Sequence, residues 1–251
     1  MAPGSRPRRP RPERAAATGE APVLYGRNAV REALRGPRTV ERVWATERAA
    51  REPWLLRGAR VQTAGADEIE RRCGSPDHQG VCAEVEPYRY ADAAALLARA
   101  DALIVALDEI QDPQNFGAIC RTAECAGATG VVIPERRSAE VTPSVCKASA
   151  GAVEHLAIAR VRNLADFLLD AGRAGAWSYG ADGDARTPYT QPDYRGKVVL
   201  VMGSEGSGLR PRVARSCDDL IALPLRGRIG SLNVSAAAAA LLYEITRRRG
   251  D

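Results

Sequence analysis

Three clusters of polar residues and glycines could carry chemistry, because each follows an apolar segment that is typical of a buried strand. They read DEIQDPQNFGAICR at 108–121, MGSEGSGL at 202–209 and LPLRGRIGSLNVS at 223–235. Open α/β sheets bind ligands at the carboxyl ends of their parallel strands. The three clusters therefore predict one ligand site built from loops, with glycines that let the backbone approach a ligand closely.

Each cluster also has a purely structural interpretation. Asn115 and Arg121 could be a helix cap and a surface arginine, since six residues separate them and place them on different faces of a helix. Glu205 stands among three glycines, as in a mobile turn, but a glutamate at that point favours a functional role. Ser231 and Asn233 precede a helical pattern, where helix capping explains one of them and not both.

Several familiar sites are missing from the sequence. It contains no phosphate-binding Gly-x-x-x-x-Gly-Lys-Ser/Thr loop, no Gly-x-Gly-x-x-Gly turn after a strand and no Gly-x-Ser-x-Gly nucleophile motif. The six cysteines lack the spacing of a zinc site and there are only two histidines, so no metal is expected. The cysteine usage and the lack of an apolar signal or membrane-spanning segment favour a reducing cytoplasm.

The elements that must position the clusters follow an α/β pattern. Continuous apolar runs, typical of parallel strands covered on both faces, lie at 103–107, 130–133 and 198–202. Helical spacing predicts helices at 116–126, 143–153, 163–174 and 232–249. The predicted fold class is therefore α/β, with a parallel sheet in the C-terminal part of the chain.

Four segments are expected along the chain. Residues 1–22 are rich in proline, arginine and alanine and lack an amphipathic period, which favours a disordered basic arm over the alternative of an organellar transit peptide. Residues 23–86 predict a small α/β module, which at roughly 65 residues is near the lower size limit for independent folding. Its strands are expected near 40–45, 60–63 and 80–85, with a helix at 67–72. Residues 87–98 predict a linker and residues 99–251 the larger domain.

The basic charge is small and unevenly placed. The formal net charge is +5, and all of the 36 basic residues except Lys147 and Lys197 are arginine. A GC-rich genome explains such a bias, and so does phosphate binding, because arginine contacts phosphate oxygens bidentately. Residues 1–20 hold five arginines and two glutamates, so the rest of the chain is nearly neutral. Any basic surface outside the arm must therefore be local.

The motifs resemble those of a known family. The stretches NFGAICR, VLVMGSEGSGL and IALPLRGRIGSLNVSAA resemble the three motifs of TrmH-like RNA 2′-O-methyltransferases of the SPOUT superfamily, over about residues 103–249. LYGRNAVREAL and HQGVCAEV resemble the N-terminal domain of the RlmB-like branch, which methylates a guanosine of 23S ribosomal RNA. The resemblance implies a trefoil-knotted C-terminal sheet, S-adenosyl-L-methionine as cofactor, a homodimer, and an N-terminal domain similar to an RNA-binding ribosomal protein.

The resemblance also implies three sets of site residues. The catalytic set is Asn115, Arg121, Glu205, Ser231 and Asn233. The cofactor-binding set is Met202, Gly203, Ser204, Gly206, Gly208, Ile221, Leu223, Leu225, Ser231, Leu232 and Asn233. The RNA-binding set is Arg27, Asn28, Arg31, Arg226 and Arg228, for which an exposed helix face and an arginine-rich proteome are the alternative explanations. The family often has methionine where this chain has Leu225, a swap of similar volume.

Two residues have roles that elementary chemistry restricts. The family assigns Arg121 to activation of the ribose 2′-hydroxyl, but a guanidinium with a pKa above about 12 accepts a proton poorly. We therefore expect Arg121 to grip a phosphate and stabilise the developing alkoxide. His78 is expected to be a structural hydrogen-bonding residue.

The predicted function is S-adenosylmethionine-dependent methylation of a ribose 2′-hydroxyl in 23S ribosomal RNA, in the cytoplasm. One alternative is the same reaction on transfer RNA or on an antibiotic-resistance site of ribosomal RNA. Another is an RNA-binding protein that has lost catalysis, against which the complete catalytic set argues. Local basic patches predict RNA binding that weakens with salt.

Overall fold

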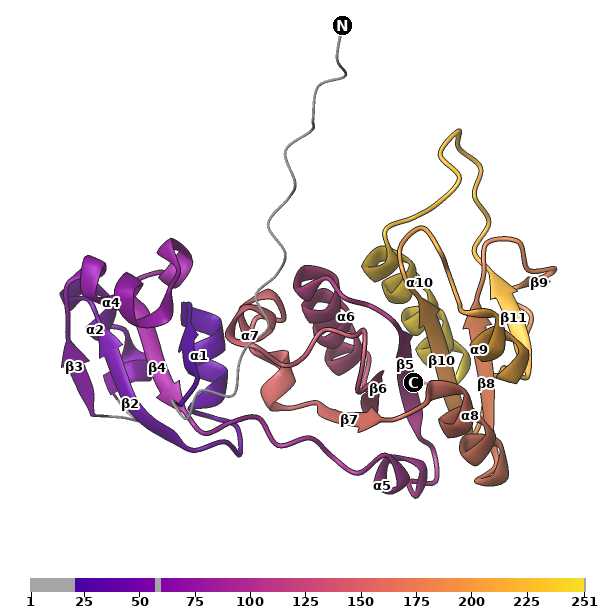
Figure 1. Ribbon diagram of the computed structural model, residues 1–251, viewed down its shortest axis with the longest axis horizontal. Helices are drawn as coiled ribbons and strands as arrows, with labels where there is room; N and C mark the ends of the chain where they lie inside the picture. Colours follow the sequence, from indigo (N-terminus) through magenta and orange to yellow (C-terminus); the bar gives the residue numbers. More distant parts are fainter. Residues whose placement is uncertain (1–20, 57–59, 251) are drawn as a thin grey trace, which may run out of the picture.

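The computed structural model describes residues 21–56 and 60–250, which form two β-sheets with their helices (Figure 1). All of the predicted basic arm except residues 21 and 22 lies outside the described residues. In the described ranges, no helix combines the length and the apolar character needed to cross a membrane.

The N-terminal sheet is mixed and has the strand order β1-β4-β2-β3. Its strands are β1 (Val23–Tyr25), β2 (Val40–Ala45), β3 (Val61–Thr63) and β4 (Val81–Val85). Strands β2 and β3 run parallel, and the other pairs are antiparallel. The helices are α1 (Arg27–Ala33), α2 (Glu47–Ala50), α3 (Pro53–Leu56), α4 (Ala66–Cys73) and the 3₁₀ turn η1 (Pro76–His78).

The C-terminal sheet has the strand order β7-β6-β5-β10-β8-β11-β9, and every pair in it is parallel. Its strands are β5 (Leu103–Asp108), β6 (Gly130–Pro134), β7 (Ala157–Val161), β8 (Ala176–Ala181), β9 (Thr187–Pro188), β10 (Lys197–Gly203) and β11 (Asp219–Ala222). The predicted fold class, α/β with a C-terminal parallel sheet and a small N-terminal module, is confirmed. The knotted chain path implied by the resemblance stays a prediction.

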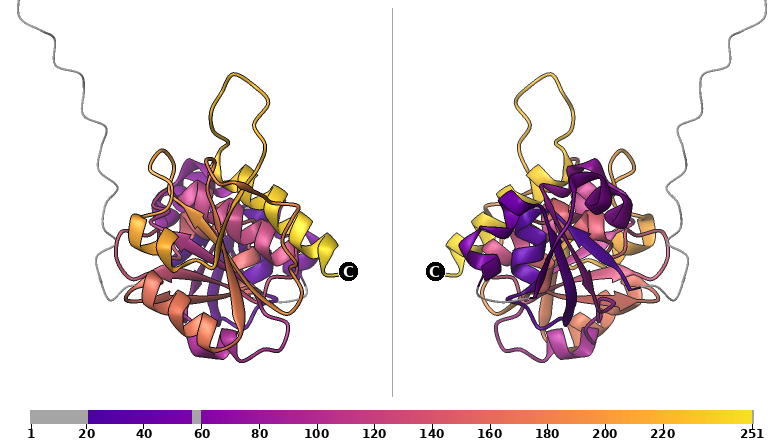
Figure 2. Two further views of the ribbon diagram at one scale, coloured as in Figure 1. Left: turned by 90° about the vertical axis from the view of Figure 1, so that its right-hand side faces the viewer. Right: turned by 90° about the vertical axis from the view of Figure 1, so that its left-hand side faces the viewer.

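Helices cover both faces of the parallel sheet, as Figures 1 and 2 show. One face packs against α6 (Pro113–Cys125), α7 (Pro143–Ala148), η2 (Ala152–Glu154) and α10 (Val234–Arg248), and the other against α5 (Ala93–Leu97), α8 (Leu164–Arg173) and α9 (Pro211–Ser216). Along β10, Leu200 and Met202 belong to the first core and Val199 and Val201 to the second. Burial on both faces explains why this strand is a continuous apolar run.

The helix predicted at 143–153 is shorter than expected. It ends at Ala148, because Ala150 and Gly151 adopt left-handed backbone angles, with φ of 53° and 88°. A residue in the left-handed region commonly ends a helix. The prediction was therefore wrong for the second half of this segment, where the turn η2 follows instead.

The predicted linker at 87–98 connects the two sheets and packs against the C-terminal part of the protein. It contains α5, whose Leu96 and Leu97 are buried in the second core. The N-terminal module also contacts the C-terminal half directly, since the guanidinium of Arg38, just before β2, forms an ion pair with Glu154 in η2, and both side chains are buried. A buried arginine–carboxylate pair restricts the relative position of the groups that it joins.

Candidate active site

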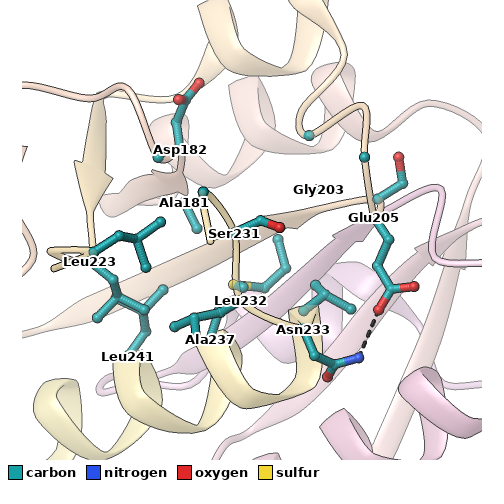
Figure 3. A pocket seen from close by; sticks show the side chains of 18 of the residues that line it. Ala181, Asp182, Gly203, Glu205, Leu223, Ser231, Leu232, Asn233, Ala237 and Leu241 are labelled. Carbon is teal, nitrogen blue, oxygen red and sulfur yellow. Dashed lines mark hydrogen bonds between the residues drawn. The ribbon is translucent and has the colours of Figure 1, made fainter. Parts of the chain in front are cut away.

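A cavity of about 400 Å³ lies at the carboxyl edge of the parallel sheet. It is formed by the segments that follow β8, β10 and β11 and by the beginning of α10 (Figure 3). All members of the cofactor-binding set line it, namely Met202, Gly203, Ser204, Gly206, Gly208, Ile221, Leu223, Leu225, Ser231, Leu232 and Asn233. The second and third clusters of the sequence therefore meet at one site, as the strand-end rule predicts.

The loop after β10 depends on its glycines. Gly203 lies so close to Gly208 that a Cβ atom on it would stand 2.2 Å from the Gly208 carbonyl carbon. Ser204 and Gly208 exchange two backbone hydrogen bonds, of 3.1 and 2.9 Å, which close the loop into a tight turn. Gly206 and Gly208 have φ of 84° and 63°, a conformation that favours glycine. The sequence GSEGSG therefore specifies a turn that presents Glu205 at the cavity.

An ion pair fixes the end of this loop. The Asp108 carboxylate, fully buried at the end of β5, accepts hydrogen bonds from the Arg210 backbone N–H (2.8 Å) and from Arg210 Nε (2.7 Å). Asp108 also pairs in register with Gly203 of β10. The loop is thus held at both of its ends on the edge formed by β5 and β10.

Three of the five proposed catalytic residues form one hydrogen-bonded cluster. The amide nitrogens of Asn115 and Asn233 donate to Glu205 Oε1 at 2.8 and 2.7 Å, and the Asn233 amide nitrogen also donates to Asn115 Oδ1 at 3.0 Å. Figure 3 shows the bond from Asn233 to Glu205 at the cavity. One residue comes from each sequence cluster, so the contacts join segments that are far apart in the chain.

Asn233 has two tasks at once. Its side-chain Oδ1 caps α10 by accepting from the backbone N–H groups of Ser235 (2.9 Å) and Ala236 (3.3 Å). These bonds orient the amide so that its nitrogen points to Glu205. Asn233 is therefore the helix cap expected in the third cluster, while Ser231 lines the cavity.

Arg121 is not brought to this cluster within the single chain. It is exposed on α6, on a different face from the buried Asn115, and it does not line the cavity. The spacing of six residues predicts these different faces. A role for Arg121 in the same chain's site is not supported by this geometry.

The five proposed RNA-binding residues lie in two places. Arg27 and Arg31 on α1 pair with Glu52 (3.1 Å) and Glu32 (2.9 Å), and Asn28 beside them is exposed. Arg226 and Arg228 are exposed in the loop before α10, which projects away from the sheet (Figure 2). The structure therefore gathers them into two separate patches.

His78 has the structural contact that the sequence predicted. It is buried at the end of η1, and its Nδ1 accepts a hydrogen bond from the Gly80 backbone N–H at 2.9 Å. The bond fixes the turn that leads into β4.

Comparison with known families identifies the family of this chain. The sequence model of the SpoU rRNA methylase family matches residues 102–243, which contain all three clusters. The chain belongs to this family. The model of the RNA 2′-O ribose methyltransferase substrate-binding domain matches residues 23–91, which hold the N-terminal sheet. The protein is thus an RNA 2′-O ribose methyltransferase with an N-terminal substrate-binding domain.

Curated relatives and solved structures agree with this SpoU assignment. A Bacillus subtilis protein placed in the TrmH family of tRNA/rRNA methyltransferases is 39% identical over 90% of this chain and 95% of its own length. A Synechocystis tRNA/rRNA methyltransferase is 41% identical over 91% of the chain, which spans 63% of that relative. The SpoU methyltransferase AviRb of Streptomyces viridochromogenes, solved with S-adenosylmethionine, has a TM-score of 0.78 at 26% identity and covers 91% of this chain and 90% of its own.

A second solved structure carries the same cofactor. The rRNA methyltransferase of Sinorhizobium meliloti, solved with S-adenosylmethionine bound, has a TM-score of 0.76 at 28% identity, covering 91% of this chain and 88% of its own. S-adenosyl-L-methionine is accordingly the cofactor of this SpoU family member, and its cavity fits that molecule. Leu223, Leu225 and Leu241 offer an apolar wall for an aromatic base, and the Asp182 and Glu205 carboxylates suit a molecule that carries positive charge.

Sequence reasoning missed part of the cavity wall. The residues not foreseen are Ala181, Asp182, Gly183, Gly230, Val234, Ala237 and Leu241. Ala181 ends β8, whose sequence AWSYGA lacks a continuous aliphatic run, and Asp182 and Gly183 follow it. The run DGD after the strand is a polar turn of the same kind as the three clusters, so the strand-end rule could have found Asp182.

Proposed function

We propose that this enzyme methylates the ribose 2′-hydroxyl of a guanosine in 23S ribosomal RNA. The observation that carries the proposal is the substrate-binding domain at 23–91, since its HQG segment resembles the ribosomal RNA branch of the family. The relatives' names cover both transfer and ribosomal RNA, so the same reaction on transfer RNA is the second candidate. We also propose that the enzyme is cytoplasmic. For the domains, we propose the boundaries predicted from the sequence, which lie between residues 22 and 23, 86 and 87, and 98 and 99.

The catalytic role that we assign to Glu205 follows from its hydrogen bonds. S-adenosyl-L-methionine supplies a methyl group already activated on a sulfonium. The two amides occupy Glu205 Oε1, and no partner for Oε2 occurs within the described part of the chain. Oε2 can therefore accept a hydrogen bond from the ribose hydroxyl, which orients the oxygen for attack. Asn115 and Asn233 act as positioning residues that fix the carboxylate, and Ser231 contributes a hydroxyl to the cavity wall.

We also propose that the active enzyme is a homodimer and that Arg121 acts across its interface. Arg121 is exposed on α6 and Tyr243 is 55% exposed on α10, and these two helices pack side by side. Aromatic and arginine side chains are both enriched in protein interfaces, so the exposure of both on two packed helices suits one. Arg121 would then bind an RNA phosphate beside the partner's cavity and stabilise the developing alkoxide.

Ribose-methylation mapping tests the substrate. Total RNA from cells with and without the gene is compared, and we expect one guanosine of 23S ribosomal RNA to lose its mark. Loss of a mark on transfer RNA with ribosomal RNA unchanged would establish the second candidate. Calorimetric titration with S-adenosylmethionine measures cofactor binding by the wild-type protein and gives the reference value for the variants below.

A further inference from the structure

A second cavity, of about 370 Å³, lies on the same edge of the parallel sheet as the cofactor cavity. It is formed by the segments that follow β5, β6 and β7 and by the beginnings of α8 and α9. Five arginines line it, namely Arg136, Arg137, Arg162, Arg210 and Arg212. We call these five residues the arginine cleft. None of them belongs to the three predicted sets of site residues, although Arg210 also anchors the loop after β10 through Asp108.

Part of this positive charge is balanced by nearby carboxylates. Glu109 stands 3.1 Å from Arg210 Nη1 and 3.6 Å from Arg137 Nη1. Asp108 binds Arg210, and Asp166 binds Arg212. Three carboxylates therefore face five guanidinium groups, which leaves an excess of two positive charges.

The excess charge belongs to two identifiable side chains. Arg136 follows β6 and Arg162 follows β7, and both are exposed. Neither has a carboxylate within ion-pair distance in residues 21–56 and 60–250. Their guanidinium groups are thus available to a ligand, while Arg210 and the carboxylates form the wall behind them.

The backbone around the cleft is held in an unusual conformation. Glu109 and Arg137 have φ of 60° and 58°, two of only four non-glycine residues with positive φ in the described chain. Such conformations cost free energy and are often found at functional sites. Asn163 caps α8, so the positive end of that ten-residue helix also lies at the cleft.

The arginine cleft is next to the cofactor cavity. Strands β5 and β10 are neighbours, and Asp108 at the end of β5 pairs in register with Gly203, which lines the cofactor cavity. Asp108 also binds Arg210 of the cleft. On the other side of the cleft, β7 directly follows η2, against which helix α1 of the N-terminal module packs (Figure 1). In the order of the sheet, the cleft is therefore nearer than the cofactor cavity to the substrate-binding domain.

We propose that the arginine cleft binds the phosphodiester backbone of the substrate RNA beside the nucleotide that enters the cofactor cavity. Guanidinium groups bind phosphate oxygens bidentately, and two of them without carboxylate partners provide the required charge. The cleft then holds the strand in register with the methyl donor, since both cavities share one rigid sheet edge. The identity of the ligand as RNA rests on the proposed function.

The test replaces only the two arginines that have no carboxylate partner. In Arg136→Ala/Arg162→Ala we expect the affinity for a short fluorescein-labelled RNA of mixed sequence to fall about tenfold at about 0.1 M salt. The slope of log affinity against log salt should become shallower by about 0.7 to 1.4, the value for one or two phosphate contacts. Arg136→Lys/Arg162→Lys keeps the charge and should keep the slope. Calorimetric affinity for S-adenosylmethionine should stay at the wild-type value in both variants.

The matched control removes two arginines from the opposite edge of the sheet. Arg99 and Arg173 are exposed near the amino ends of β5 and β8, and Arg99→Ala/Arg173→Ala changes the net charge equally. An affinity and slope equal to those of this control would overturn the proposal. A loss of S-adenosylmethionine affinity as large as the loss of RNA affinity would overturn it as well. Absence of methyl transfer by the wild-type enzyme would instead refute the proposed function, while the salt slopes still test the cleft.

Discussion

The Asp108 carboxylate binds both the backbone and the guanidinium of Arg210, and this pair stands between two cavities. On one side it anchors the loop that carries Glu205, and on the other it forms the wall of the arginine cleft. Asp108 is fully buried, whereas the Arg210 side chain is 42% exposed. The charge of the buried Asp108 carboxylate is thus balanced by Arg210, and the position of the loop after β10 depends on both residues.

Asp108→Asn should loosen this loop. The amide keeps the size of the side chain but loses the charge that binds the guanidinium, and we expect a loss of about 1–3 kcal/mol in the free energy of unfolding. The affinity for S-adenosylmethionine should fall as well, because the loop after β10 lines its cavity. Urea denaturation and calorimetric titration measure the two effects.

The control for this prediction is an exposed ion pair of the same composition. Asp193 binds Arg195 at the surface, and exposed pairs contribute little to stability. Asp193→Asn should therefore leave the urea midpoint and the cofactor affinity unchanged. If both variants lose the same stability, the buried position of Asp108 has no special importance.

Asn233→Asp should separate the two tasks of this residue. The new carboxylate still accepts the capping hydrogen bonds, so α10 and the melting temperature should be preserved. It also places a second negative charge 2.7 Å from Glu205 Oε1, where an amide nitrogen now donates. We expect methyl transfer to fall about tenfold or more, because the carboxylate is no longer held in place.

The pH dependence of Asn233→Asp tests this explanation for the loss of activity. Two adjacent carboxylates raise the pKa of one of them, and the protonated form can donate a hydrogen bond as the amide did. The activity of Asn233→Asp, relative to wild type, should therefore rise as the pH is lowered from about 8 to about 6. Asn233→Ser keeps a capping oxygen without the added charge and should show no such rise. If the pH profiles of activity run parallel in Asn233→Asp and Asn233→Ser, the explanation is refuted.

Much of the cofactor cavity could be predicted because its signals are local. Glycines 203, 206 and 208 directly follow a buried strand, and the strand-end rule places such a loop at a ligand site. The alternation of Val199, Leu200 and Val201 between two cores likewise follows from a continuous apolar run.

The contacts that assemble the site could not be predicted in the same way. Asp108 and Arg210 are 102 positions apart, and nothing in the local sequence of either residue indicates its partner. The second task of Asn233 was hidden for a similar reason, because capping alone explains an asparagine before a helix. Arg136 and Arg162 each look like a solvated surface residue, and only the parallel order of β6 and β7 brings them to one cleft.

Alkaline pH should destabilise the folded protein through its buried thiols. Burial raises the pKa of Cys146 to about 11 and that of Cys82 and Cys217 to about 12, from the ordinary value of 9.0. As the pH rises, the thiols of the unfolded chain lose their protons first, near pH 9. The free energy of unfolding is therefore unaffected below pH 9 and falls as the pH rises toward the pKa values of the thiols in the folded protein. The melting temperature should fall steadily between about pH 9 and about pH 11.

Single cysteine variants check the cause of this alkaline loss. Cys217→Ala removes one of these thiols, which is partly buried, and should make the fall of the melting temperature less steep. Cys125 is exposed on α6, and Cys125→Ala should keep the slope close to that of wild type. A melting temperature that stays constant up to about pH 10.5 would contradict the assignment.

Mixed dimers can decide where Arg121 acts. In the single chain it stands outside the cavity, on a different face of α6 from Asn115. If it acts across a homodimer interface, Arg121→Ala and Glu205→Gln chains are each inactive alone, but their mixed dimer contains one site with both residues intact. We expect co-expression with two affinity tags, followed by isolation of the doubly tagged dimer, to recover up to about half of the wild-type rate.

An inactive mixed dimer would refute action across the interface, provided that a tagged wild-type dimer isolated in the same way is fully active. Arg121→Lys then separates charge from geometry, because a lysine keeps the positive charge but cannot contact a phosphate bidentately.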